Sequence, residues 1–163
     1  MDLLALDVPC GWAVFHAGEY VSSGQIKDVP VRRQKRRPGV YHWRENYFGT
    51  LMGRIVASMD EKNIKPGQYR LVVLEDMPPM NRTARSTQSL AEKSGVFMYF
   101  FDAREYWQVH PRTWMRGRPP SVLNLQAAVL AKKSVGMDEQ DAIMLGNWAL
   151  SEQWKMKVLA DMS

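Results

Sequence analysis

Apolar residues along the chain follow two patterns, short continuous runs and longer segments of helical spacing. Residues 1–8 and 68–76 contain short apolar runs that end in acidic residues, which is typical of buried strands. In residues 84–101 the apolar positions recur as on one face of a helix. With the Pro and Gly breaks between them, these patterns predict strands over 1–8, 11–17, 20–26, 68–76 and 105–109, helices over 41–63, 84–101 and 122–133, a last helix from Asp138 onward, and a loop over the basic segment 27–40.

The order of these elements predicts an α/β fold with a mixed sheet. Three strands in succession at the start indicate an antiparallel meander. A right-handed crossover through the first helix would then bring 68–76 beside 1–8, in parallel. The 163 residues show no linker and no internal repeat, so we expect one domain over 1–163.

Four carboxylates stand where an ionised group is costly or repelled by its neighbours. Asp7 and Glu75 each end an apolar run, and the predicted topology puts them at the same end of adjacent strands. Leaving an unpaired charge there costs free energy. Asp138 and Asp141 are three residues apart, so they share one face of the last helix. Taken alone, this pair is also explained as helix N-terminal acids stabilised by the helix dipole.

The three carboxylate segments together favour a metal centre. Hard divalent cations take oxygen ligands, and four carboxylates are enough to hold two ions for phosphodiester hydrolysis. Asp76 and Glu139 neighbour these ligands in the sequence, but strand and helix periodicity directs them elsewhere.

The formal net charge of +5 favours a polyanionic partner. The basic residues are clustered, which is explained either by solvated loops or by contacts with DNA phosphates spread over several loops. The tryptophans are more readily explained as core residues than as base-stacking groups, and Trp114, which lies within one cluster, is the best candidate for an exception. The candidate DNA-binding residues are Arg32, Arg33, Lys35, Arg36, Arg37, Arg82, Arg85, Arg112, Arg116 and Arg118.

Cysteine usage and hydropathy indicate the compartment. Cys10 is the single cysteine, which excludes an internal disulfide and fits a reducing environment. The chain has no apolar run long enough to span a membrane, and its first residues lack a basic leader. We therefore expect a cytoplasmic protein with no membrane partner.

Four segments together resemble the RuvC-type Holliday junction resolvases of the RNase H-like superfamily. They are LALDVPCGWAVF (4–15), LVVLEDMPPMNRTARSTQSLAEKSGV (71–96), VHPRTWMR (109–116) and MDEQDAIML (137–145). The resemblance implies an RNase H-like fold, a five-stranded mixed sheet flanked by helices. It also implies a homodimer that uses Mg²⁺ or Mn²⁺ to make paired nicks in four-way DNA junctions. By position, its metal ligands are Asp7, Glu75, Asp138 and Asp141.

Three departures from the family pattern resemble compact phage or viral relatives, and hence a bacterial or phage-infected host cell. The turn after Asp7 is short, the loop after Glu75 offers methionines (Met77 and Met80) where bacterial enzymes have an aromatic wedge, and Lys132-Lys133 replaces a glycine-rich basic loop.

Three functions are compatible with these sequence features. The leading hypothesis is a metal-dependent endonuclease that resolves four-way junctions. The second is an RNase H-like nuclease with broad specificity for branched DNA, flaps or RNA–DNA hybrids. The third is a non-catalytic DNA-binding module, but acids that face phosphate give a pure binder no advantage. The helix over 84–101 is more apolar than one buried face requires, which predicts that it lies at a dimer interface.

Overall fold

A computed structural model of the chain describes residues 2–7, 11–26, 34–37, 40–42, 47–65, 67, 69–76 and 84–162. For residues 34–37, 40–42, 47–48, 84–90, 92 and 93 it describes the backbone alone. The strands are β1 (Asp2–Asp7), β2 (Gly11–His16), β3 (Glu19–Gln25), β4 (Gln34–Arg37), β5 (Val40–His42), β6 (Leu71–Glu75) and β7 (Glu105–Val109). The helices are α1 (Tyr47–Asp60), α2 (Ala84–Phe101), α3 (Pro111–Met115), α4 (Pro120–Ala131) and α5 (Met137–Asp161).

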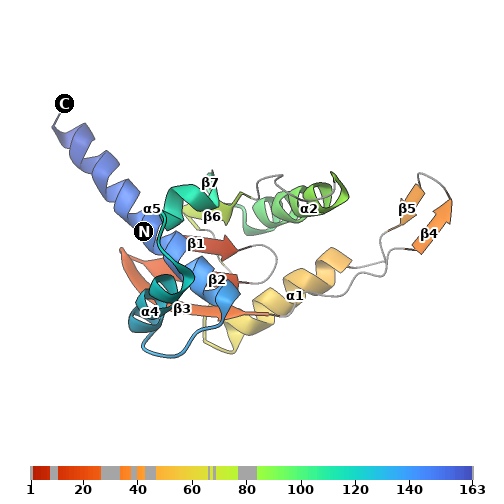
Figure 1. The fold of residues 1–163 in the computed structure, drawn as a ribbon, viewed down its shortest axis with the longest axis horizontal. Coiled ribbons are helices and arrows are strands. Elements are labelled where there is room, and N and C mark those ends of the chain that lie inside the picture. The colour runs from red at the N-terminus through yellow and green to blue at the C-terminus, as the bar shows by residue number, and fades with distance from the viewer. Residues whose placement is uncertain are drawn as a thin grey trace.

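Five strands form a mixed sheet in the order β3-β2-β1-β6-β7 (Figure 1). The first three strands are antiparallel neighbours, as the sequence predicts. Strand β6 lies parallel to β1, with Leu6 opposite Leu74, and β7 lies parallel to β6. The predicted five-stranded mixed sheet is therefore confirmed. The carboxyl ends of the parallel strands β1, β6 and β7 lie at the same end of the sheet.

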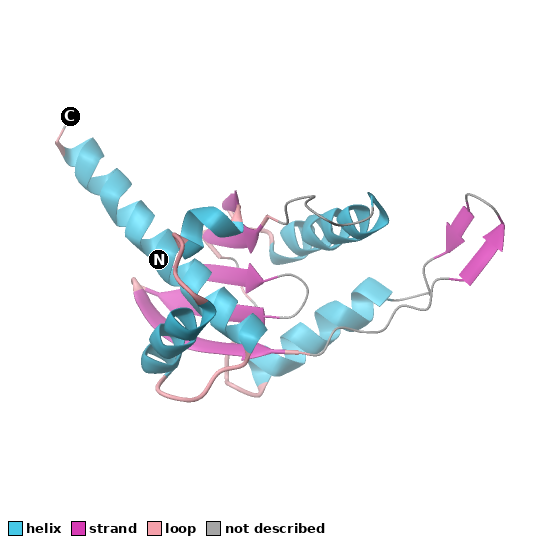
Figure 2. Ribbon diagram, in the orientation of Figure 1, coloured by secondary structure: helices cyan, strands magenta, loops and turns pink. Residues whose placement is uncertain are grey.

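Helices cover both faces of this sheet (Figure 2). On β1, Leu4 and Leu6 point into a core shared with α1 and α2. Leu3 and Ala5 point the other way, into a core shared with α3, α4 and α5. Side chains alternate along a strand, so β1 needs apolar residues at all four of these positions, and they are fully or almost fully buried.

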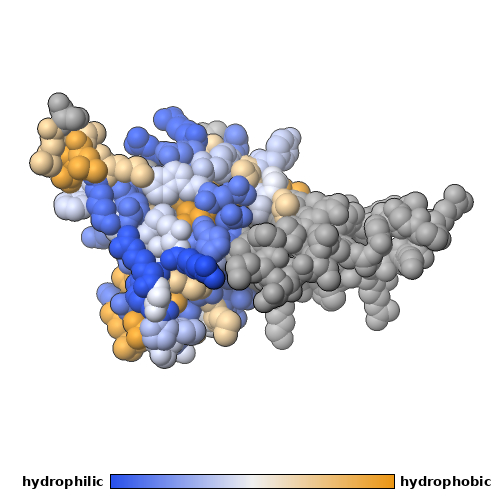
Figure 3. Space-filling model, turned by 45° about the horizontal axis from the view of Figure 1, so that its top comes forward, coloured by the Kyte–Doolittle hydropathy of each residue, from blue (hydrophilic) through white to orange (hydrophobic). Residues whose placement is uncertain are grey.

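Glycines let α5 pack closely against the first hairpin. A Cβ atom on Gly11 would lie 1.9 Å from the backbone oxygen of Asp138, and a Cβ atom on Gly146 would lie 2.2 Å from the ring of Phe15. Only glycine fits such close approaches without a shift of the neighbouring backbone or ring. The helix continues past the sheet, and Figure 3 shows apolar side chains gathered at its projecting C-terminal end.

Three segments differ from the sequence predictions. The predicted loop over 27–40 is wrong in part, because β4 and β5 form a small two-stranded sheet. The predicted helix over 41–63 begins only at Tyr47, since 40–42 is a strand. Helix α3 was not predicted. Strand β4 is wholly polar and α3 is only 5 residues long, so neither carries a periodic apolar signal.

No helix of the described residues is both long and apolar enough to cross a membrane.

Candidate functional site

Asp7 and Glu75 end neighbouring parallel strands. The last paired residues of β1 and β6 are Leu6 and Leu74, and the two acids come directly after them. Asp7 has the same parity as Ala5, and Glu75 the same parity as Val73, so both carboxylates lie on the face covered by α3, α4 and α5. The structure thus places the two acids at the same end of adjacent strands, as the crossover argument predicts.

The N-terminus of α5 brings Asp138 and Asp141 to the same place. Gly11 pairs with Asp7 across the first hairpin, and the backbone of Asp138 lies against Gly11. Asp141 follows one helical turn later, on the same face as Asp138. The missing side chain of Gly11 is therefore what allows the acidic end of α5 to approach the end of β1.

The pKa of Asp7 responds to the other three carboxylates. Burial, followed by the charges of Glu75, Asp141 and Asp138, raises the pKa of Asp7 from 3.8 to about 8. Burial also raises the pKa of Asp141, and the Asp138 charge adds to this, although Gln140 Nε2 donates a hydrogen bond to Asp141 Oδ1 at 2.9 Å. Three segments far apart in the sequence therefore form one electrostatic unit.

The buried indole of Trp114 donates a hydrogen bond to the Glu75 carboxylate. Helix α3 directs the indole into the core, where it is fully buried, and its Nε1 donates a hydrogen bond to Glu75 Oε2 at 3.0 Å. The core position favoured for the tryptophans therefore holds at Trp114, and the alternative of base stacking is wrong because the ring is fully buried. The stacking alternative came from the arginines that flank Trp114 in the sequence, Arg112, Arg116 and Arg118.

The donor set fits hard divalent cations. Carboxylate oxygens are the ligands that Mg²⁺ and Mn²⁺ prefer. A divalent cation would also offset the cost of ionising Asp7 among three other acids. Within the described residues, no three His, Cys, Asp or Glu side chains converge closely enough to hold a metal ion as they stand. The four carboxylates are near enough for their charges to affect Asp7, but their side chains are not arranged as a coordination shell.

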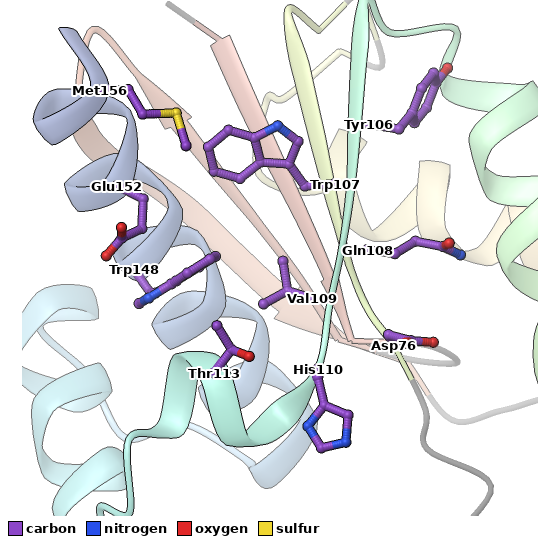
Figure 4. A pocket seen from close by; sticks show the side chains of 10 residues that line it. All are labelled: Asp76, Tyr106, Trp107, Gln108, Val109, His110, Thr113, Trp148, Glu152 and Met156. Atoms are coloured by element: carbon purple, nitrogen blue, oxygen red, sulfur yellow. The ribbon is translucent and has the colours of Figure 1, made fainter. Parts of the chain in front are cut away.

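Asp76 and Glu139 turn away from this centre. Asp76 is exposed at the mouth of a cavity of about 700 Å³ between β7 and α5 (Figure 4). Trp107 and Trp148 line the cavity with their rings edge to face at 6.3 Å, and His110 lies at the end of β7. None of the four carboxylates lines this cavity.

The candidate DNA-binding residues have unequal outcomes. Arg32, Arg33 and Arg82 lie outside the described residues, and for Lys35, Arg36, Arg37 and Arg85 the structure describes the backbone alone. Arg112 is exposed. Arg116 pairs with Glu152 at 2.6 Å. Arg118 donates to Trp114 O at 2.8 Å and to Met115 O at 3.0 Å, so its guanidinium holds α3 in place.

Comparison with known proteins supports the fold. No family model and no curated protein sequence matches the chain. Among solved structures, the chain resembles Thermus thermophilus RuvC in complex with a Holliday junction substrate, at a TM-score of 0.65 and 10% identity over 94% of this chain and 96% of that one. It also resembles a second Thermus thermophilus RuvC structure, at a TM-score of 0.58 and 12% identity over 95% and 97% of the two chains. The predicted RNase H-like fold is thus confirmed, and the likeness to these RuvC structures is one of fold.

Proposed function

We propose that this chain is a metal-dependent endonuclease that resolves four-way DNA junctions by hydrolysing phosphodiester bonds. One observation carries the proposal. Asp7 lies buried at the carboxyl end of β1 within electrostatic reach of Glu75, Asp141 and Asp138, and burial together with these three charges raises its pKa to about 8. A fold gains no stability from such a cluster, because like charges repel and burial penalises them. The cluster is useful where a cation and a phosphate meet.

The chain's own residues would hold and orient the reacting groups. Asp7, Glu75, Asp138 and Asp141 would bind Mg²⁺ or Mn²⁺, and Trp114 fixes the orientation of Glu75. When bound, such ions activate water and stabilise the charge that develops on the phosphate and leaving oxygens. Because Asp7 binds a proton near neutral pH without metal, metal binding would release that proton.

Junction DNA is the substrate that the structural likeness favours. One of the similar structures is a RuvC protein bound to a Holliday junction. We carry this substrate over to the present chain as part of the proposal. The broader RNase H-like nuclease, acting on flaps, generic branched DNA or RNA–DNA hybrids, would use the same carboxylates. The substrate panel below separates the two.

Resolution of a junction needs two opposed nicks, and one chain offers one carboxylate cluster. A two-fold dimer would supply both nicks. Helix α2 carries apolar residues that its own core leaves uncovered: Tyr99 is 90% exposed and Phe100 is 44% exposed, whereas Phe97 and Phe101 are buried. We propose that this outer face of α2 joins two copies of the chain.

The dimer proposal is tested by mass in solution. Light scattering should give twice the chain mass for the wild type and the monomer mass for a Tyr99→Ser, Phe100→Ser variant. The matched control is Leu125→Ser on α4, which is also an exposed apolar residue (67%) but lies on the other side of the sheet. Equal masses for all three proteins would contradict the α2 interface.

A substrate panel tests the function itself. End-labelled four-way junction, flap, linear duplex and RNA–DNA hybrid are incubated with the protein in Mg²⁺ and in EDTA. We expect symmetrical nicks in the four-way junction in Mg²⁺ and no nicks in EDTA. Equal cleavage of all branched and hybrid substrates would support the broad nuclease, and junction binding without cleavage in Mg²⁺ or Mn²⁺ would support the non-catalytic module.

A further inference from the structure

Two lysines meet at the free edge of strand β3, on the side of the sheet opposite β7. Lys62 follows α1, and its Nζ donates to the backbone oxygen of Ser23 at 2.5 Å. Lys133 precedes α5, and its Nζ donates to Glu139 Oε1 at 2.5 Å. The Ser23 hydroxyl donates to the same Glu139 oxygen at 2.6 Å. Lys62 thus contacts Ser23 directly, and Lys133 is linked to the same residue through Glu139.

Charge is not balanced within this cluster. Glu139 is buried and supplies one negative charge to two ammonium groups. Burial lowers the pKa of Lys62, and the Lys133 ammonium lowers it further. The charges of Glu139 and of the exposed Glu61 offset only part of this effect. The Lys62 ammonium also lies 5.9 Å from the centre of the Trp12 ring. Two cations held this close together favour an anion that bridges them.

The lysine cluster lies near the same end of the sheet as the carboxylate centre. Strand β3 runs in the direction of β1, two strands away, so the lateral separation is about 10 Å. Ser23 pairs with Ala13, which pairs with Ala5, close to the end of β1. Glu139 comes directly after Asp138, so one turn of α5 faces the carboxylates with one side and the lysines with the other.

We propose that Lys62 and Lys133 together bind a backbone phosphate of the DNA strand that enters the carboxylate centre. The inference rests on the proposed function for the identity of the polyanion. The alternative is that the lysines only hold the edge strand β3 in place. That role explains each hydrogen bond by itself, but it does not require two ammonium groups in one cluster. The Lys133 side chain is 38% exposed, so a phosphate can reach it.

The first test is the salt dependence of binding to a four-way junction in EDTA, where no cleavage occurs. Lys62→Gln and Lys133→Gln should each lower the salt slope, and the double variant should lower it by about 0.9, the value for one phosphate contact on duplex DNA. The control is Lys157→Gln, an exposed lysine on the projecting part of α5, which should keep the wild-type slope. Since Lys62 does not bond the buried Glu139, Lys62→Gln remains informative if Lys133→Gln fails to fold.

The decisive test couples the protein to the DNA. Single neutral methylphosphonates replace the phosphates on either side of the cleavage position, one at a time. At one position the loss of affinity seen with wild type should be smaller with Lys62→Gln and should vanish with the Lys62→Gln, Lys133→Gln double variant, because the contact is then already gone. Additive losses at every position, or unchanged salt slopes, would show that the lysines only clamp the edge strand. This readout is binding, so a failure of cleavage with intact coupling would overturn the proposed function and leave the phosphate site.

Discussion

Replacing Asp7 by Asn should stabilise the metal-free protein at alkaline pH while destroying its activity. Asn keeps the size and shape of the side chain but carries no charge. In the folded protein, ionising Asp7 is opposed by burial and by Glu75, Asp141 and Asp138. The unfolded chain imposes no such cost. The substitution therefore removes a penalty that only the folded wild type bears.

The size of this effect follows from proton linkage. The pKa of Asp7 is 3.8 in the reference state and about 8 in the folded protein. Between these values the folded state binds more protons than the unfolded state, so the free energy of unfolding falls as pH rises. Each pKa unit corresponds to about 1.4 kcal/mol. Because the side chain is partly exposed, we expect a loss of about 2 to 4 kcal/mol between pH 5 and pH 8 in wild type and its absence in Asp7→Asn.

Urea denaturation in EDTA at several pH values measures this difference. The free energy of unfolding of Asp7→Asn should rise relative to wild type as pH increases. The control is Asp76→Asn, an exposed acid beside Glu75 that should follow the wild-type profile. At pH 8, adding Mg²⁺ should stabilise wild type but not Asp7→Asn. If the free energy of unfolding had the same pH dependence in wild type and Asp7→Asn, the argument that burial and the neighbouring acids oppose ionisation of Asp7 would be refuted.

Three further predictions concern two residues that pack against the site and the basic segment 32–37. Gly11→Ala would place a Cβ atom 1.9 Å from a backbone oxygen in α5. It should cost about 1–3 kcal/mol in thermal or urea unfolding and slow junction cleavage, whereas Gly53→Ala, where nothing lies within 4 Å, should not destabilise the protein. Trp114→Phe removes the donor to Glu75 Oε2, so it should cost about 1–2 kcal/mol in urea unfolding and slow junction cleavage. Neutralising two basic residues within 32–37 should reduce the salt slope of DNA binding by about 2, measured by fluorescence anisotropy, and an unchanged slope would place that segment away from DNA.

The sequence predicted the elements whose apolar pattern is continuous. The runs that end in Asp7 and Glu75 are buried strands, and the crossover rule brought them together in parallel. Helix α2 has the bounds that its periodicity predicts, 84–101. These elements form because local pattern and core burial favour the same structure.

Other features depend on partners far away in the sequence. The inward direction of Trp114 is decided by Glu75, 39 residues earlier. The need for glycine at position 11 appears only when α5 lies over it. The meeting of Lys62 and Lys133 depends on two helices ending at the same strand, and no local pattern reports it.

The central claim is that Asp7, Glu75, Asp138 and Asp141 form one divalent metal centre. Anomalous diffraction from crystals soaked in Mn²⁺ tests it most directly, because it locates the ion without reference to activity. We predict one or two anomalous peaks among these four carboxylates in the wild type and their loss in Glu75→Gln. Strong peaks elsewhere with none among the four acids, at Mn²⁺ concentrations that support DNA cleavage, would contradict the account.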